Sequence, residues 1–211
     1  MPESSEVFNL VLYAFYELDP AHYRPTLDHV AAMLDALPKY GLPLESSLSK
    51  GKPFYNLICG LAFASPLEAY ALAAKHDLEQ LAVDISHHLH STPLYDLTDE
   101  LCLSMGPIYL RRLIFLHLGR IERLKKLLQE PPGHEPTMQC DAVDQKHKLV
   151  ALWREKASTL CWDVSPSTPV SLLQATLSPI VEKLGCNECK VSTRERIRQI
   201  IVEWTMVKST I

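Results

Sequence analysis

Residues 65–90 read SPLEAYALAAKHDLEQLAVDISHHLH and carry the clearest local signals in the chain. Ser65 and Glu68 have the spacing of a capping box, and Pro66 suits the first position of a helix. After a break at His76-Asp77, a second helix is indicated by an apolar stripe: Leu78, Leu81, Ala82, Ile85 and Leu89. The stretch predicts a helical hairpin with an apolar seam and no catalytic side chains on it, which favours an interaction protein over an enzyme.

Composition sets broad limits on the class of protein. The chain has 211 residues, 47% of them hydrophobic, enough for one large or two small domains with a sizeable core. A net charge of −4 gives no general argument for nucleic acid or an anionic membrane as partner. Apolar runs fall short of the roughly 20 residues of a membrane span, and the N-terminus lacks the pattern of a secretory signal. We therefore expect a cytoplasmic or nuclear protein.

The rest of the chain repeats the helical pattern. Seven glycines against 15 prolines fit short helices that begin at proline rather than strands joined by glycine turns. The segment Lys39-Tyr40-Gly41-Leu42 recurs as Lys75-His76-Asp77-Leu78, each time between two helical stretches. No segment alternates in the manner of a strand. The sequence predicts an all-α array of short helical hairpins, with about nine to twelve helices and no substantial sheet.

A long helix is expected from about Pro107 to Gln129, with Gly119 as a weak point. Its apolar stripe faces away from a basic set: Arg112, Arg120, Arg123 and Lys126. A solvated face is the common explanation of such a set, and a phosphate or acidic partner is the alternative. After this helix, the stretch EPPGHEPTMQC at 130–140 is the best candidate for a linker.

Three stretches in a fixed order resemble the BTB/POZ proteins that are expanded in fungi. They are ESSEVFNLVLYAFYE (3–17), LDALPKYGLPLESSL (34–48) and SPLEAYALAAKHDLEQLAVDISHHL (65–89). Tyr109-Leu110-Arg111-Arg112-Leu113 and Leu116-His117 are similar to the continuation of that family. The resemblance covers about residues 1–130, and beyond them it rests on spaced tryptophans and a late Cys-x-x-Cys.

The resemblance implies a division of the chain. Residues 1–62 would be the helical half of a BTB/POZ-like domain and 63–130 a BACK-like helical extension. A linker at 131–143 would lead to a C-terminal helical segment at 144–211. The chain starts about where the strand-rich half of a BTB domain should end, so homodimerisation of the family type is left open.

The resemblance also implies a function: a protein–protein interaction module, as an adaptor for a cullin ubiquitin ligase or a transcriptional co-regulator. The partner-facing residues would be Tyr13, Tyr16, Lys39, Tyr40 and Leu42. A purely structural helical scaffold is the first alternative. An enzyme is the second, since a site assembled from distant residues would leave no motif.

Cys186 and Cys189 form the only pair at metal-ligand spacing. A structural zinc needs four ligands. The resemblance implies Cys140 as the third, because proteins of that type carry a cysteine near this point, and either His134 or His147 could be the fourth. Two buried cysteines at a helix end are the plain alternative, and a redox pair would need a βαβ context that is not seen. The sequence therefore predicts either no cofactor or a zinc ion at this one place.

The remaining histidines give weaker signals. His87, His88 and His90 lack the spacing of a metal site on a helix and fit a helix end. His117 falls within an apolar stripe and fits a core histidine. No nucleophile elbow or phosphate loop occurs in the sequence. No catalytic residue or cofactor-binding residue is therefore predicted, and neither a membrane nor nucleic acid is the expected partner.

Overall fold

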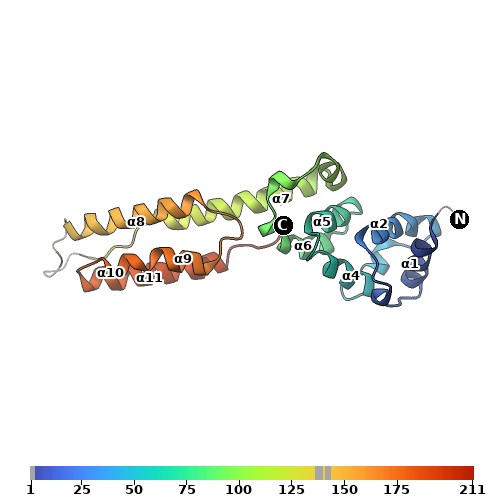
Figure 1. Ribbon diagram of the computed structural model, residues 1–211, viewed down its shortest axis with the longest axis horizontal. Coiled ribbons are helices and arrows are strands. Elements are labelled where there is room, and N and C mark those ends of the chain that lie inside the picture. Colours follow the sequence, from blue (N-terminus) through green and yellow to red (C-terminus); the bar gives the residue numbers. More distant parts are fainter. Residues whose placement is uncertain (1–2, 136–139, 141–143) are drawn as a thin grey trace. The chain divides into compact units, whose positions relative to one another are not determined.

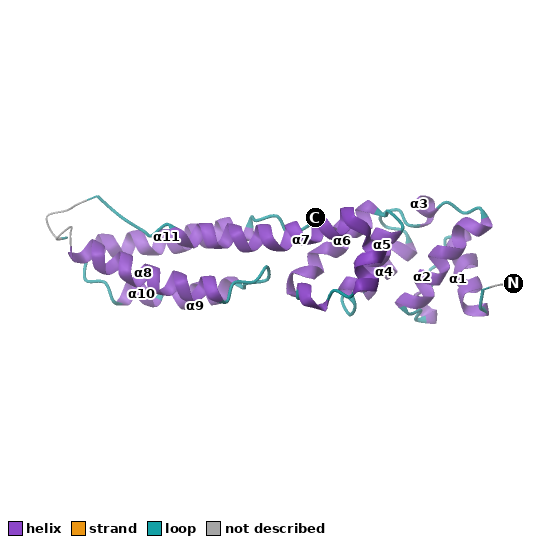
Figure 2. Ribbon diagram, turned by 90° about the horizontal axis from the view of Figure 1, so that it is seen from above, coloured by secondary structure: helices purple, strands orange, loops and turns teal. Residues whose placement is uncertain are grey.

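The computed structural model describes residues 3–135, 140 and 144–211. The described residues form helices and no strand, as expected for the all-α class. They divide into two compact units (Figures 1 and 2). Unit 1 comprises Met1–Phe115 with Ser209–Ile211, and unit 2 comprises Leu116–Lys208. The division does not follow the boundaries drawn from the resemblance. Within the predicted linker, 136–139 and 141–143 lie outside the described residues.

Unit 1 contains α1 to α6 and the first part of α7, joined by short 3-10 turns. The α-helices are α1 (Ser5–Phe15), α2 (Leu27–Ala36), α3 (Leu44–Ser47), α4 (Pro53–Leu61), α5 (Pro66–Lys75), α6 (Glu79–Ser86) and α7 (Asp99–Gln129). The 3-10 turns are η1 (Ala21–Tyr23), η2 (Leu37–Tyr40), η3 (His87–Ser91) and η4 (Leu94–Asp96).

The helix α5 is the centre of the core of unit 1. Ala69, Tyr70 and Ala73 are fully buried, and the hydroxyl of Tyr70 donates a 2.9 Å hydrogen bond to the carbonyl of Tyr109. Pro66 occupies the start of this helix as predicted. Ser65 makes no side-chain capping bond, so the expected capping box is wrong: its φ of −137° and ψ of 69° differ from the cap geometry seen at Thr26.

The repeated four-residue segment has a structural explanation. In both copies the third residue has positive φ, +73° at Gly41 and +52° at Asp77. The amide of Leu42 bonds to the carbonyl of Leu37, and the amide of Leu78 bonds to that of Ala73. This is the Schellman motif, which ends a helix and satisfies its last carbonyls. The repeat is a shared way of ending a helix.

The long helix α7 contributes to both units. It is continuous from Asp99 except at Gly106, where φ is +68°, so a short helix and a longer one meet there. The backbone angles that interrupt the helix lie at Gly106 and not at Gly119, the weak point expected from the sequence. By length and composition α7 is the one helix among the described residues that could cross a membrane, with 28% of its apolar window buried. One such helix is weak evidence, because core helices pass the same test.

Unit 2 is built from the second part of α7 with α8 (Asp144–Trp162), α9 (Val170–Leu177), α10 (Pro179–Glu182) and α11 (Asn187–Thr205). Its core contains Trp153 and Trp204. The Trp153 indole donates to the carbonyl of Leu128, and that of Trp204 to the carbonyl of Thr168, both at 2.9 Å. The α-helix restarts at Pro179, because proline supplies no amide to continue the one before it.

Three basic side chains of α7 have two different roles. Arg112 pairs with Glu79 at 2.7 Å, and Arg123 pairs with Glu203 at 2.9 Å. Arg120 is partly buried and donates to the carbonyls of Pro166, Val207 and Lys208 at 2.8 to 3.0 Å. The predicted solvated face is therefore wrong at Arg120, whose guanidinium fastens two segments of unit 2 and lies over the ring of Trp204.

Candidate metal centre

Four potential ligands from three separate stretches meet in unit 2. They are His134, Cys140, Cys186 and Cys189, and their ligand atoms all lie within 4.8 Å of one another. Cys140 and Cys189 are buried, and His134 and Cys186 are half-buried. The three predicted cysteines are thus brought together. The structure also decides the fourth position in favour of His134, because His147 is exposed on α8 and lies outside the group.

Two of the three contact distances between the ligand atoms are close to those of a tetrahedral zinc site, and the third is shorter. Zinc–sulfur bonds of about 2.3 Å at the tetrahedral angle place two sulfurs about 3.8 Å apart, and a sulfur and an imidazole nitrogen about 3.6 Å apart. The sulfurs of Cys140 and Cys189 are 3.8 Å apart. The Nε2 atom of His134 lies 3.1 Å from the Cys189 sulfur and 3.8 Å from the Cys186 sulfur. The group could hold a metal such as zinc.

The cysteine pair is positioned by the start of α11. Cys186 is the N-cap residue and Cys189 lies in the first turn, so their side chains fall on the same face of that turn. The backbone amide of Cys189 is the main cause that lowers the pKa of Cys186, to about 7. The pair thus combines helical spacing with the backbone amides that favour a thiolate.

Burial acts on Cys189 in the opposite direction. It raises the pKa of this thiol to about 12, with the neighbouring cysteines adding to the effect. Without a metal Cys189 is therefore a thiol near neutral pH. Binding of a divalent cation would displace its proton, because the thiolate is the form that ligates.

His134 is oriented by a backbone carbonyl. Its Nδ1 lies 2.6 Å from the carbonyl oxygen of Glu135. With the proton on Nδ1, the imidazole donates this hydrogen bond and leaves the Nε2 lone pair directed at the cysteines. Metal-ligating histidines are commonly fixed by this kind of outer contact.

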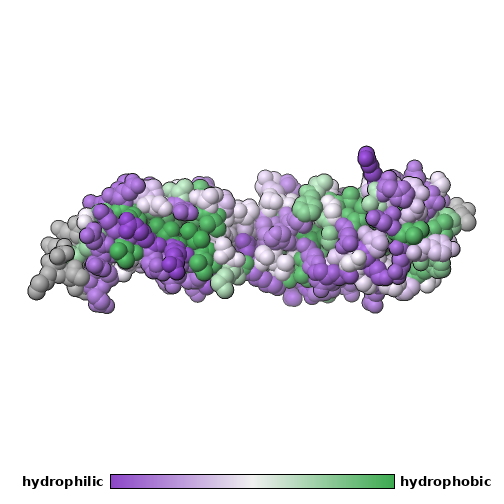
Figure 3. Space-filling model, turned by 90° about the horizontal axis from the view of Figure 1, so that it is seen from below, coloured by the Kyte–Doolittle hydropathy of each residue, from purple (hydrophilic) through white to green (hydrophobic). Residues whose placement is uncertain are grey.

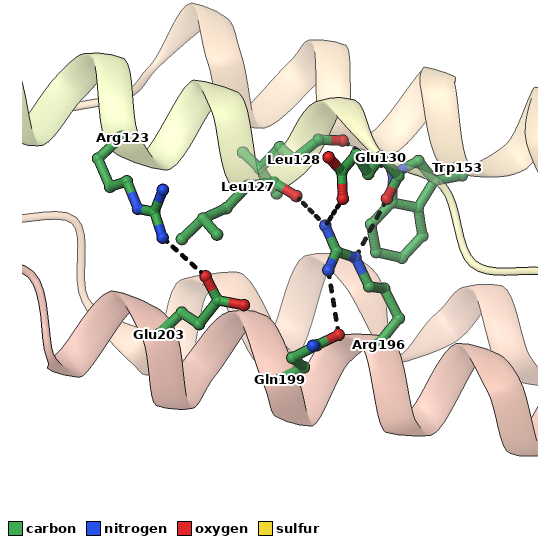
Figure 4. Close-up of polar contacts among 8 residues, drawn as sticks. All are labelled: Arg123, Leu127, Leu128, Glu130, Trp153, Arg196, Gln199 and Glu203. Atoms are coloured by element: carbon green, nitrogen blue, oxygen red, sulfur yellow. Dashed lines mark hydrogen bonds and ion pairs between the residues drawn. The ribbon is translucent and has the colours of Figure 1, made fainter.

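Residues of α11 hold the segment that leads from the end of α7 to His134. Figure 4 shows the contacts that Arg196 makes with Leu127 and Glu130. The guanidinium of Arg196 donates to the carbonyls of Leu127 at 2.9 Å and Glu130 at 3.2 Å, and to the Glu130 carboxylate at 3.2 Å. The hydroxyl of Ser192 donates to the carbonyl of Gly133 at 2.7 Å. Ser192 and Glu195 have the spacing of a capping box, which predicts from the sequence that the last helix starts at Ser192. This prediction is wrong, since α11 begins five positions earlier, at Asn187.

The other readings of these residues are less well supported. No disulfide joins the six cysteines, all of which the structure describes, and no strand precedes Cys186 in the described part of the chain. The context of a redox pair is therefore not present. The metal groupings found among the described residues do not include His87, His88 or His90. His90 instead contacts the carbonyl of Ser209 at 2.8 Å. His117 is buried, as a core histidine would be.

The predicted partner-facing residues lie in unit 1 and have different surroundings. Tyr16 is 65% exposed at the end of α1, whereas Tyr13 bonds to Tyr23 at 3.2 Å. Lys39 and Tyr40 both contact the carboxylate of Glu3, at 3.3 and 2.8 Å. Leu42 packs against the core.

An exposed apolar face of α1 was not predicted from the sequence. The apolar residues of α1 run nearly all round the helix, which indicates a central helix. The structure buries only one side, with Val7, Leu10, Val11 and Ala14. Leu12, Phe15 and Tyr16, which we call the α1 outer face, are 39%, 57% and 65% exposed. Periodicity could not distinguish the two arrangements.

Comparison of the chain with protein-family models, with curated proteins and with solved structures found no significant match.

Proposed function

We propose that unit 2 binds one zinc ion through His134, Cys140, Cys186 and Cys189, and that the ion has a structural role. The observation that carries this proposal is the convergence of four ligand atoms within 4.8 Å. Three thiolates and one imidazole suit zinc better than harder cations. All four positions of a tetrahedral site would be filled by the protein, which is typical of structural rather than catalytic zinc.

The zinc would connect segments that are distant in sequence. It would join the start of α11 to Cys140 and to the segment that follows α7. Because these segments are not in contact in the unfolded chain, the binding free energy contributes to folding. The protein would therefore be a helical scaffold whose C-terminal unit depends on metal.

The test is the metal content and stability of the full chain purified without chelator. We expect about one zinc per chain and a melting temperature of unit 2 that falls by about 10 °C or more after chelation. Cys161→Ser is the control, because Cys161 is half-buried on α8 outside the group. This variant should keep the zinc content and the melting temperature of the wild type. Zinc below about 0.2 per chain in the wild type would contradict the proposal.

A second proposed function, on the α1 outer face, is protein–protein interaction of the BTB/POZ type in the cytoplasm or nucleus. What supports it is the exposed apolar face of this helix at Leu12, Phe15 and Tyr16. Aromatic residues of this kind are enriched at protein interfaces. The resemblance to BTB/POZ proteins implies a cullin or a transcriptional co-regulator as the partner.

Binding of the full chain to a purified cullin N-terminal domain tests the cullin arm of this function. We expect a complex at tens of micromolar that is lost in Phe15→Ser/Tyr16→Ser. The matched control is Phe63→Ser, at an aromatic residue that is 75% exposed outside α1. Absence of a complex at about 100 µM rules out the cullin role.

A further inference from the structure

A groove on unit 2 lies apart from the candidate metal centre. It has a volume of about 520 Å³ and lies between α11 on one side and α9 with α10 on the other. Its floor is apolar: Val181 and Ile197 are buried, and Ile201 is half-buried. Val202, 49% exposed, continues this apolar surface to the mouth of the groove. Figure 3 shows apolar surface on this side of unit 2, bordered by hydrophilic side chains.

The two rims of the groove differ in charge. One rim carries Gln174, Ser178 and Glu182, and the other carries Arg194 and Arg198. The two arginines are four positions apart on α11 and therefore lie on the same face, one turn from each other. Both are exposed, and within the described residues neither takes part in an ion pair or a side-chain hydrogen bond.

Three other arginines of unit 2, Arg120, Arg123 and Arg196, have internal partners. Arg196 binds the carbonyls at the end of α7, Arg123 pairs with Glu203, and Arg120 binds three carbonyls. Arg194 and Arg198 lack such partners and stand directly beside an apolar floor. The rim residues carry one negative and two positive charges, so the groove has a net positive charge.

The dimensions of the groove favour a helix as the occupant. From Arg194 to Val202 the floor and rim extend about 12 Å along α11, which is two to three helical turns. An amphipathic helix binds such a groove with apolar residues at positions i, i+3 and i+4. Carboxylates four positions apart on its flank would face the two arginines.

We propose that this groove is a docking site for an acidic amphipathic helix of a partner protein. The site differs from the zinc centre in residues and chemistry, and it goes beyond the proposed zinc function. The apolar floor supplies the contact area, and Arg194 with Arg198 select the acidic partner and its direction.

The experiment uses the full chain, loaded with zinc, and a fluorescein-labelled designed peptide. The peptide is an 18-residue amphipathic helix with leucines on one face and glutamates four positions apart on its flank. We expect a dissociation constant of tens of micromolar. A matched peptide with lysine in place of each glutamate should bind at least about tenfold more weakly.

Three variants locate the site. Arg194→Gln/Arg198→Gln should weaken binding about tenfold, and Val202→Asp should weaken it further by placing a carboxylate at the mouth. The matched control is Lys148→Gln/Arg154→Gln, which removes two exposed charges from α8 and should leave binding unchanged. Circular dichroism of each variant confirms that the fold is retained.

Other occupants give different results. Binding to vesicles with 30% anionic lipid, but not to the peptide, would assign the groove to a membrane surface and overturn the proposal. A dimer that forms in the wild type and is lost in Arg194→Gln/Arg198→Gln would assign it to a second copy of the chain and also overturn it. No peptide binding at about 200 µM, or equal binding by the double variant, would do the same.

Discussion

Cys186 and Cys189 lie three positions apart, yet their surroundings shift their pKa values in opposite directions. The amide of Cys189 lowers the pKa of Cys186, and burial raises that of Cys189. The position of a residue in a turn therefore decides its chemistry as much as its type does. His134 and His147 give a second example. Both are histidines near Cys140 in sequence, but only His134 is held with its ring toward the sulfurs.

His134→Ala should reduce zinc affinity by more than about a hundredfold. Loss of a residue that only orients a ligand already costs ten- to a hundredfold, and His134 would be a ligand itself. Competition with a chromophoric chelator measures the affinity. His147→Ala is the control and should bind zinc like the wild type, so an equal loss in both variants would contradict the assignment of His134.

Asp84 gives unit 1 a pH-dependent contribution to stability. Hydrogen bonds from Lys50 at 2.8 Å and from Tyr55 at 2.6 Å lower the pKa of this carboxyl. Because the pKa is lower in the folded state, the contribution is present above the unfolded value of about 3.8 and is lost as the pH falls through the folded pKa.

Asp84→Asn should therefore destabilise unit 1 by about 1 to 2 kcal/mol at pH 7. The difference from the wild type should shrink at an acidic pH below the unfolded value of about 3.8, as the wild-type carboxyl takes up its proton. Urea unfolding at both pH values measures this. The exposed Asp96→Asn is the control, and a difference that is the same at both pH values would exclude the ionised carboxylate as its source.

At the scale of elements, α11 shows what could be predicted from the sequence and what could not. Its apolar face and the Cys-x-x-Cys spacing could be predicted from the sequence, because both depend on local periodicity. The start of the helix was misplaced at Ser192, since the Ser-x-x-Glu pattern occurs inside helices as well as at their ends. The hydroxyl of Ser192 and the guanidinium of Arg196 instead serve carbonyls more than 55 positions away, and no local signal marks such contacts.

The same distinction applies to the other helices. The paired helix ends at Gly41 and Asp77 were visible as a repeat because the motif is local. The burial of Arg120 and the exposure of Phe15 could not be predicted from the sequence, because both depend on which helices pack together. The all-α class followed from periodicity alone, whereas the division into units followed from packing.

Arg196→Gln tests whether α11 positions His134. The shorter side chain cannot reach the carbonyls of Leu127 and Glu130, so we expect a loss of about 2 kcal/mol of stability and a roughly tenfold lower zinc affinity. Arg198→Gln, two positions along α11 on the groove rim, is the matched control and should change neither quantity. If the Arg196→Gln protein is as stable as the wild type and binds zinc with unchanged affinity, Arg196 does not position His134.

On the scale of the whole molecule, the two units should respond differently to loss of metal. All the proposed ligands belong to unit 2, and so do the protein's three tryptophans, Trp153, Trp162 and Trp204. Tryptophan fluorescence therefore reports on unit 2 alone. The core of unit 1 is formed by its own residues and includes none of the proposed ligands.

Chelation should accordingly loosen unit 2 and leave most of unit 1 intact. Hydrogen exchange followed by mass spectrometry should show faster exchange in peptides from 116–208 and little change in those from 3–98. Fluorescence should report the same event, and added zinc should reverse it. Equal acceleration in both units would contradict a metal site confined to unit 2.

The central claim is that one zinc is bound by three cysteine sulfurs and one histidine nitrogen. X-ray absorption at the zinc edge of the full chain tests it most directly, because the spectrum counts the ligands and measures their bond lengths. We predict three sulfurs at about 2.3 Å and one nitrogen at about 2.0 Å. A shell of four sulfurs, or one made only of oxygen and nitrogen, would contradict the account.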